Sequence, residues 1–389
     1  MRKRIFSILL TIAVCLSMMP AGVWAADGET SGQGTNSEHS HCICGGNTNV
    51  NGHSHSTDLD FQPWTETDKL PNEGTYYLTE SVTISGKWSP TGEVKLCLNG
   101  KTISGSITVG TGATLTLTDC TNKGRIQGNN NSTSVTVNGG TFNMYGGTIT
   151  DGGGVYVGEK CSFTMDGGNI TGNTATAGNG GGIYIHNLAT KAEISNALIT
   201  NNKATATGNV SFGLGGGIYS QKNLTVNNSA ITGNEATYYG GGICGAGSIT
   251  LNSTVVTGNK STKGNGGGMY TSKMSSTSVT NQPLSISGST QIKDNAPNNY
   301  HVNEARQLPI NVTAALTYSA VIYVDVYEGL KPDYNSTLTI AEPKSGVTLD
   351  ASNFKADAAD CVTGVDENGK VYLALCEHKM GNTGYTCEK

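Results

Sequence analysis

The chain has 389 residues, of which 54 are glycine, 14% are charged and 6% are aromatic, and its formal net charge is −5. This glycine-rich, weakly charged composition differs from that of a compact α/β enzyme and is typical of a β-solenoid. Beyond the first 25 residues the only arginines are Arg125 and Arg306, which argues against nucleic acids and other polyanions as partners.

The first 25 residues have the pattern of a secretory signal. Arg2-Lys3-Arg4 gives the basic start, Ile5 to Met19 the apolar core, and Val23-Trp24-Ala25 the small-residue cleavage site. Cleavage would leave 21 basic and 29 acidic residues, a net charge of −8. No other segment approaches the roughly 20 apolar residues of a membrane span. We therefore expect a secreted or cell-surface protein without a membrane span.

Residues 26–57 form a tail without apolar periodicity, and we expect disorder around a small group of histidines and cysteines. The group comprises His39, His41, Cys42, Cys44, His53 and His55. These residue types suit zinc, but a C-x-C pair lacks the usual C-x₂₋₄-C spacing. Two interpretations stay open: a metal site built from His41, Cys42, Cys44 and His53, or a disordered or disulfide-linked tail. We expect no other cofactor.

Residues 58–93 are richer in aromatic residues than the rest, and we predict that they form an N-terminal cap over the open end of a solenoid. From Val94 the sequence alternates apolar and polar residues, so 94–304 is predicted to be the solenoid itself. Nine cysteines follow the signal, an odd number, so at least one is free, intermolecular or a ligand. Cys97 and Cys120 are 23 residues apart, about one turn, and are expected to stack and pair.

A repeat between about Gly152 and Asn295 organises the chain. Three glycines, an apolar residue and usually a tyrosine recur five times, at Gly152–Tyr156, Gly180–Tyr184, Gly215–Tyr219, Gly240–Cys244 and Gly266–Tyr270. The triplets are 28, 35, 25 and 26 residues apart. A period of this length with uneven insertions indicates a solenoid whose loops vary while its core does not.

A second motif, an apolar residue and Thr-Gly-Asn, recurs between the triplets. It ends at Asn173, Asn202, Asn234 and Asn259, with a looser copy at Asn295. Each unit contains about three short strands, and one turn cannot bury its own apolar face, whereas stacked turns bury a continuous column. Asparagines repeated at one corner of every turn are expected to form an amide ladder.

The Gly-Gly-Gly-Ile-Tyr and Ile-Thr-Gly-Asn units resemble the repeats of right-handed parallel β-helix proteins of the pectin-lyase-like superfold, especially the polymorphic outer-membrane-protein type found in surface adhesins. The flanks Cys42-Ile-Cys44, Leu96-Cys-Leu-Asn-Gly100 and Cys376-Glu-His378 are similar to those of large secreted surface proteins of Gram-positive gut bacteria. The resemblance implies an all-β, right-handed parallel β-helix with N- and C-terminal caps. It implies little about chemistry, because fold does not fix function.

After the repeats, residues 305–375 remain strand-like but lose the glycine motif. They are predicted to form final irregular turns or a C-terminal β cap. Residues 376–389 form a Cys/His tail, with Cys376, His378 and Cys387, that looks like the start of a longer module. This pattern leaves open whether the chain is a fragment of a longer surface protein.

The tyrosines that follow the glycine triplets are the candidate ligand-binding residues. If Ile183 and Ile185 point inward, Tyr184 points outward by strand alternation. The same holds for Tyr156, Tyr219 and Tyr270, while Cys244 interrupts the row. A row of exposed rings offers apolar faces on which sugars stack. The alternative is that the rings stack only on one another and stabilise the sheet.

Paired carboxylates would indicate glycoside hydrolysis, which needs two acids on one face. Of the scattered acids in the repeats, only Asp151 and Asp166 are candidates for approaching each other. The Asn-Thr-Asp, Asp-Asp, Gly-His-Gly and Arg-Ile-Lys motifs of the pectin-cleaving relatives do not occur. The sequence therefore favours a non-catalytic, adhesin-like module that binds polysaccharide or a host or cell-surface protein. A pectin-lyase-like carbohydrate-active enzyme and a structural stalk are the alternatives.

Overall fold

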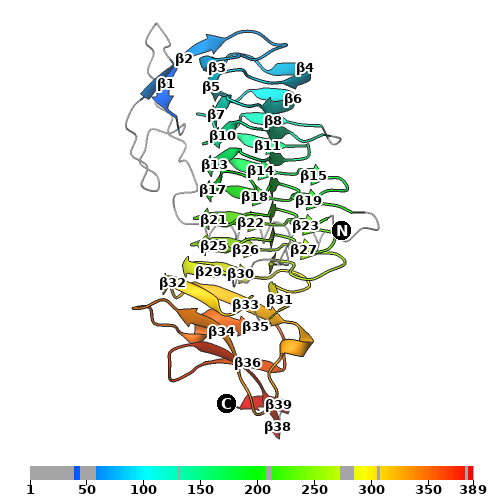
Figure 1. Ribbon diagram of the computed structural model, residues 1–389, viewed down its shortest axis with the longest axis vertical. Helices are drawn as coiled ribbons and strands as arrows, with labels where there is room; N and C mark the ends of the chain where they lie inside the picture. Colours follow the sequence, from blue (N-terminus) through cyan, green and yellow to red (C-terminus); the bar gives the residue numbers. More distant parts are fainter. Residues whose placement is uncertain are drawn as a thin grey trace.

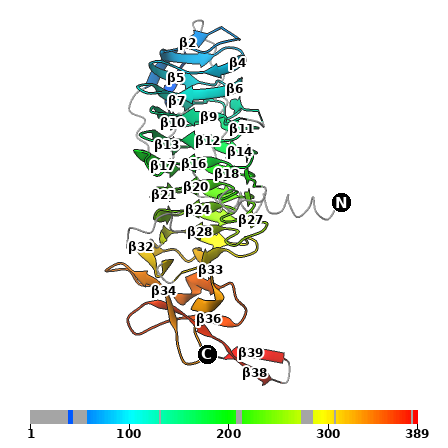
Figure 2. The same cartoon turned by 45° about the vertical axis from the view of Figure 1, so that its right-hand side comes forward.

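The computed structural model is an elongated column of stacked β-strands (Figure 1), and a second view shows the same stacking from another side (Figure 2). The structure describes residues 39–43, 58–129, 132–206, 213–271, 284–304, 307–381 and 384–388. Within these residues the regular elements are strands and two short 3-10 turns, Glu328–Leu330 and Ala351–Asn353. This architecture confirms the all-β parallel β-helix.

Three columns of strands form the walls, and we call them faces 1, 2 and 3. Face 1 is a sheet of 15 strands among the described residues. In spatial order its strands are β1 (His39–Cys42), β2 (Asp58–Trp64), β3 (Gly74–Leu78), β5 (Glu93–Cys97), β7 (Thr114–Thr118), β10 (Thr141–Met144), β13 (Ser162–Asp166), β17 (Lys191–Ser195), β21 (Leu224–Asn227), β25 (Ile249–Asn252), β29 (Ser285–Gly288), β32 (Ile310–Leu316), β34 (Leu338–Pro343), β37 (Val371–Leu375) and β36 (Cys361–Val365).

Faces 2 and 3 belong to one sheet, because the long strands β6 and β33 pair with both. Face 2 contains β4 (Val82–Trp88), β6 (Thr102–Val109), β8 (Arg125–Gln127), β11 (Thr148–Thr150), β14 (Asn169–Thr171), β18 (Leu198–Thr200), β22 (Ala230–Thr232), β26 (Val255–Thr257), β30 (Gln291–Lys293), β33 (Val321–Val326) and β35 (Phe354–Ala356). Face 3 contains β9 (Val135–Val137), β12 (Val155–Val157), β16 (Ile183–Ile185), β20 (Ile218–Ser220), β24 (Ile243–Gly245), β28 (Met269–Thr271) and β31 (Tyr300–Val302).

Each regular turn runs from face 1 to face 2, through a corner strand, and then to face 3. The corner strands form a small parallel sheet of β15 (Thr174–Ala175), β19 (Lys203–Ala204), β23 (Glu235–Ala236) and β27 (Lys260–Ser261). Neighbouring turns pair in register, so that Ile183 lies beside Val155 on one side and Ile218 on the other. Like residues therefore stack on like residues along the column.

The core is a continuous column of apolar side chains. The three-residue strands of face 3 alternate, so that Ile183 and Ile185 are fully buried while Tyr184 between them points outward. In face 1, the rings of Phe142 and Phe163 stack at 5.7 Å. Burial of a large apolar side chain contributes roughly 1.5–3 kcal/mol to the stability of the fold. Stacking of the turns buries such side chains in every turn.

The asparagines at the corner after face 2 form the expected ladder. Nδ2 of each residue donates to Oδ1 of the next at 2.9–3.0 Å, through Asn173, Asn202, Asn234, Asn259, Asn295 and Asn299. In each of the first five asparagines, the backbone N–H donates to the same Oδ1 atom that accepts from its side chain. At the end of the ladder, Nδ2 of Asn299 donates to the carboxylate of Asp357 at 2.6 Å. The ladder thus satisfies polar groups that are buried at each corner.

Both ends of the column depart from the repeat. The segment assigned to an N-terminal cap contributes β2, β3 and β4, which pair in parallel with the turn that follows, and β1 pairs antiparallel with β2. At the other end β36 and β37 form an antiparallel pair next to β34. β38 (Glu377–Gly381) and β39 (Gly384–Glu388) form a separate hairpin. Such additions cover strand edges that would otherwise pair with other chains.

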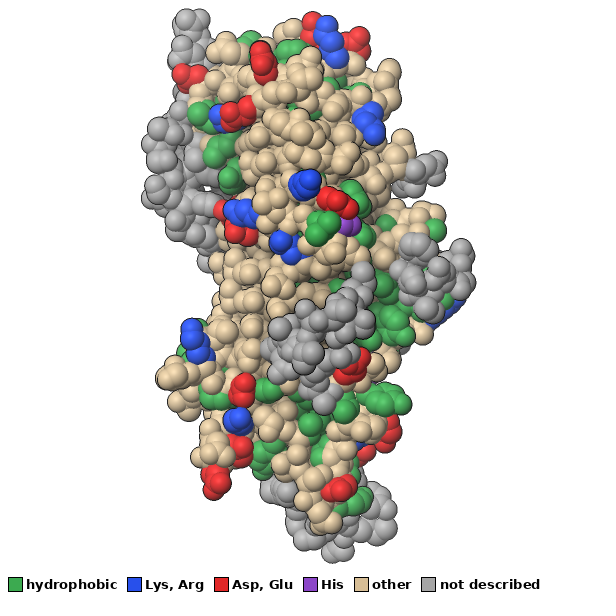
Figure 3. Space-filling model, viewed as in Figure 1, with side chains coloured by type: hydrophobic (Ala, Val, Ile, Leu, Met, Phe, Trp, Pro, Cys, Tyr) green, Lys and Arg blue, Asp and Glu red, His purple; other side chains and the backbone are tan. Residues whose placement is uncertain are grey.

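The described surface is mainly polar and uncharged. In the space-filling view, lysines, arginines and acidic residues are scattered, and no patch of one sign gathers on the face shown (Figure 3). None of the described helical segments is long and apolar enough to cross a membrane.

Candidate functional site

The predicted tyrosine row runs along face 3. The register places Tyr156 beside Tyr184 and Tyr184 beside Tyr219. Their ring centroids are 5.0 Å and 5.3 Å apart, the first pair nearly parallel and the second tilted by 48°. Neighbouring parallel strands impose this spacing, so the rings contact one another as the structural interpretation of the sequence expected.

Beyond Tyr219 the row is interrupted and then resumes. Cys244 takes the next position and lies fully inside the structure. Tyr270 follows it, and its ring is stacked at 4.6 Å on Tyr239, which comes from the loop before β24. The row ends at His301, which is 6.0 Å from the ring of Tyr270 and 2.5 Å from the carboxylate of Asp325.

The four tyrosines differ in how much surface they present. Tyr219 is only 3% exposed, whereas Tyr156, Tyr184 and Tyr270 are partly exposed. Sequence alternation predicts the side of the strand that a residue faces, but it cannot show what covers that side. A ligand could therefore reach three of the four predicted rings, and Tyr219 acts as a packed member of the row.

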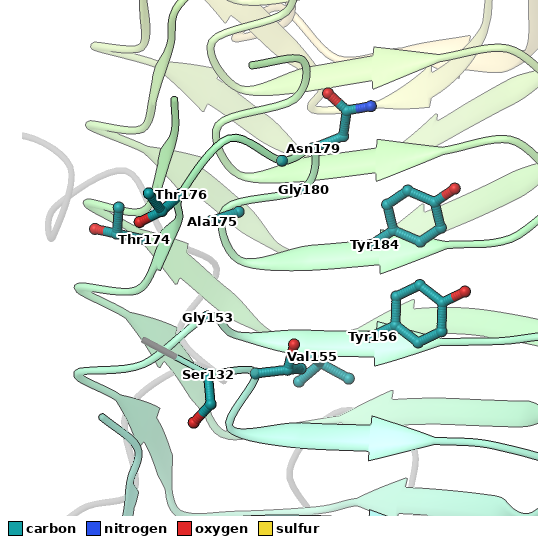
Figure 4. Close-up of a pocket in the computed structure, with 12 residues that line it drawn as sticks. Ser132, Gly153, Val155, Tyr156, Thr174, Ala175, Thr176, Asn179, Gly180 and Tyr184 are labelled. Carbon is teal, nitrogen blue, oxygen red and sulfur yellow. The ribbon is translucent and has the colours of Figure 1, made fainter. Parts of the chain in front are cut away.

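A groove lies beside Tyr156 and Tyr184, the two partly exposed rings at the start of the row. Its volume is about 610 Å³, and Figure 4 shows Tyr156 and Tyr184 projecting in the same direction from neighbouring strands. The other residues that line it are Ser132, Thr133, Gly153, Val155, Thr174, Ala175, Thr176, Gly178, Asn179 and Gly180. Its lining among the described residues thus combines aromatic rings, hydroxyl groups and an amide, without a charged side chain.

The loop that forms the far wall of the groove is fastened to the next turn. Gly178 donates its backbone N–H to the carbonyl of Thr205 at 3.1 Å, and Gly180 donates to the carbonyl of Leu214 at 2.9 Å. The side-chain oxygen of Asn179 accepts from the N–H of Leu214 at 3.0 Å. The wall is therefore held in place before any ligand arrives, which lowers the entropy cost of binding.

Burial shifts the ionisation of the row. It raises the pKa of Tyr184 to about 12, with smaller contributions from the neighbouring tyrosines, and raises that of Tyr270 to about 12. The pKa of Tyr219 is also raised by burial. A neutral phenol is thus favoured in the folded state, and the unfolded chain would release these protons first, near pH 10.

We expect stability to decline as the pH rises between about 10 and about 12. A raised folded-state pKa means that the stabilisation is complete below the unfolded pKa and is lost as the pH approaches the folded one. Thermal unfolding followed by circular dichroism over this range measures the decline. Tyr184→Phe should make the decline shallower, and an equally steep decline in that variant would contradict the expectation.

The two candidate acids lie at different corners of two neighbouring turns. Asp151 follows β11 of face 2, is exposed, and accepts from Nε2 of Gln127 at 3.2 Å. Asp166 ends β13 of face 1 and accepts from Nδ2 of Asn196 at 2.6 Å. Neither lines the groove, so the structure gives no support for a carboxylate pair there.

Of the predicted metal ligands, His41 lies in a cluster, but its neighbours there are His39, Cys97 and Cys120 and not the predicted ones. The four side chains each offer one ligand atom, and these atoms all lie within 4.8 Å of one another. Cys44, His53 and His55 lie outside the described residues, as does the side chain of Cys42. The two thiols are close, as their spacing predicted, but both are free, with the sulfurs 3.6 Å apart.

The two thiols of the cluster differ in acidity. The pKa of Cys120 is lowered because the thiol of Cys97 donates a hydrogen bond to its sulfur, with further contributions from His39 and His41. The same hydrogen bond, together with burial, raises the pKa of Cys97. Of the tail cysteines, Cys376 is disulfide-bonded.

Comparison with known proteins adds no assignment. The chain matches no protein-family model, and neither a curated protein nor a solved structure matches it significantly.

Proposed function

We propose that the protein is a secreted or cell-surface, adhesin-like module that binds a neutral glycan in the groove beside Tyr156 and Tyr184. The observation that carries this proposal is the pairing of two partly exposed, nearly parallel rings with a hydrogen-bonded loop across the groove from them. A site there would be accessible on the side of a long column of stacked strands, which supports the proposal.

The chemistry of the groove suits sugars. A pyranose ring has one apolar face that packs on an aromatic ring and several hydroxyls that need polar partners. Tyr184 packs between Tyr156 and Tyr219, so it presents its ring edge to the groove, and Tyr156 at the end of the row offers the ring surface on which the apolar face of a sugar can pack. Ser132, Thr133 and Thr176 supply hydroxyl partners from the groove lining. A charged glycan is less suited, because no described side chain of the lining would neutralise it.

The proposal is of binding without turnover. Glycoside hydrolysis needs two carboxyl groups a few ångström apart at the scissile bond. Asp151 and Asp166 bond to partners on different faces, and the groove is lined by other residues. The signal-like first 25 residues and the resemblance to surface adhesin repeats support export and a role at the cell surface.

We expect the double change Tyr156→Ala/Tyr184→Ala to weaken glycan binding at least about tenfold, because stacking of a base or ring on an aromatic side chain contributes roughly 1–3 kcal/mol per contact. An array of host and microbial glycans and matrix proteins, probed with purified protein, gives the binding partner. The same array records loss of the immobilised glycan. Titration with the best glycan then gives the change in affinity.

Tyr318→Ala/Tyr334→Ala is the matched control, since these tyrosines are 99% and 71% exposed and do not line the groove. Unchanged glycan binding by Tyr156→Ala/Tyr184→Ala would reject the groove as the site. Retention of matrix proteins alone would make the partner a protein, and absence of any binding would favour a structural stalk. Loss of the immobilised glycan would show an enzyme.

A further inference from the structure

Four side chains from distant parts of the sequence converge at the N-terminal end of face 1. His39 and His41 are two residues apart on β1, so their side chains lie on the same side of that strand. Cys97 is the last residue of β5, and Cys120 follows β7, the next strand of the sheet. β1 lies at the outer edge of face 1, where it pairs with β2 (Figure 1).

Three of the six separations between the four ligand atoms are close to those of a tetrahedral zinc site, and all six are within 4.8 Å. Zn–S bonds of about 2.3 Å and Zn–N bonds of about 2.0–2.1 Å at tetrahedral angles give S···S, N···N and S···N separations of about 3.8, 3.3 and 3.5 Å. In the structure, the sulfurs of Cys97 and Cys120 are 3.6 Å apart, Nε2 of His39 and His41 are 3.1 Å apart, and Cys120 Sγ is 3.5 Å from His39 Nε2.

We propose that His39, His41, Cys97 and Cys120 bind one zinc ion, which fastens β1 to the first turns of the solenoid. Two sulfurs and two imidazole nitrogens in a tetrahedral arrangement are the donor set that selects zinc. Four protein ligands fill the coordination shell, so the site is structural and leaves no position open for a substrate.

The surroundings hold the ligands in place. The ring of His39 is stacked at 4.2 Å on Tyr77, and that of His41 at 4.5 Å on Phe61. Cys97 is fully buried and His41 is 7% exposed, while His39 and Cys120 are partly exposed. Such packing fixes ring orientation, as the groups around a metal site usually do.

Charge favours the same assignment. Zinc binds thiols as thiolates and imidazoles in the neutral form. Two thiolates and one Zn²⁺ therefore give a neutral unit, whose burial costs far less than that of an unpaired ion. A disulfide between Cys97 and Cys120 would leave the convergence of both histidines on the sulfurs without a chemical reason, and the sulfurs are 3.6 Å apart rather than bonded.

The test is zinc content by elemental analysis and native mass spectrometry of the purified protein, together with cobalt substitution. We expect one zinc per chain, and with cobalt a thiolate charge-transfer band and the strong visible bands of a tetrahedral site. Cys97→Ser/Cys120→Ser should lose the metal and the charge-transfer band. His39→Asn, which lies on β1 outside the stacked turns, should also lose zinc while the circular dichroism spectrum of the column is kept.

Cys42→Ser/Cys44→Ser is the matched control, because these cysteines are close to His39 and His41 in the sequence and the proposed site does not use them, so this variant should keep zinc. Chelation should increase hydrogen exchange in β1. A metal-free protein with Cys97 and Cys120 joined in a disulfide would overturn the proposal. Loss of zinc by Cys42→Ser/Cys44→Ser with retention by Cys97→Ser/Cys120→Ser would overturn it as well.

Discussion

Gly216→Ala should lower the free energy of unfolding by about 3 kcal/mol, at the upper end of what inserted methyl groups cost. Gly216 is the middle residue of its triplet and lies between the backbones of neighbouring turns. A Cβ there would be closer than 3.0 Å to the carbonyl oxygen of Gly241 and to the backbone of Glu235. Because both obstacles are backbone atoms of stacked strands, no side chain can rotate away to make room.

Urea denaturation followed by circular dichroism measures the loss, and hydrogen exchange locates it in the turns that contain β20 and β24. Gly110→Ala is the matched control. It also lies between strands, but the nearest atom to its added Cβ is Oγ of Ser89 at 3.8 Å, and its φ is not positive. If both variants lost the same stability, close approach of the turns would not be the reason for the glycine triplets.

Asn234→Ala should lower the free energy of unfolding by about 3–5 kcal/mol, because each buried polar group left without a partner costs roughly 1–3 kcal/mol. Oδ1 of Asn234 accepts from both the backbone N–H and the side-chain amide of Asn202. Nδ2 of Asn234 donates to the carbonyl of Ile199. The residue is fully buried, so water cannot replace these partners without opening the corner.

The matched control is Asn252→Ala, which removes an asparagine from the partly exposed row on face 1. Asn252 donates to Asn227 at 2.7 Å, and solvent can take its place, so we expect a loss of about 1 kcal/mol or less. Denaturant unfolding of both variants at one temperature gives the comparison. A cost for Asn234→Ala no larger than that for Asn252→Ala would show that the ladder does not stabilise the column.

The parts of the fold that recur in the sequence were predictable from it. Glycine and asparagine at fixed places in each repeat have a local physical cause, since one permits close approach of two backbones and the other satisfies a buried corner. The ladder from Asn173 to Asn295 and the stacking of Tyr156 on Tyr184 follow from that pattern. The proximity of Cys97 and Cys120 follows from the length of one turn.

What the sequence did not predict depends on contacts between non-repeating segments. The repeat pattern does not extend to β1 and therefore cannot predict that β1 folds back onto face 1. For that reason His41 was grouped with its sequence neighbours Cys42 and Cys44, and not with Cys97. Nor does the repeat pattern show that Tyr219 is buried while Tyr184 is partly exposed, because the loops between Asn and Gly differ in length from turn to turn. The groove depends on the loop of residues 174–180, whose counterparts in the following turns differ in length and sequence.

The asparagine ladder has a direction. The side-chain amides of Asn173, Asn202, Asn234 and Asn259 each donate to the asparagine of the following turn, and that of Asn295 donates to Asn299, four residues on. The last donor, Asn299, meets the carboxylate of Asp357, a group that accepts hydrogen bonds. A whole turn inserted or deleted within the row would keep each donor matched to an acceptor, whereas a change at Asp357 would leave the terminal donor unmatched. The length of the column is therefore free to vary in units of one turn during evolution, while its terminus is constrained.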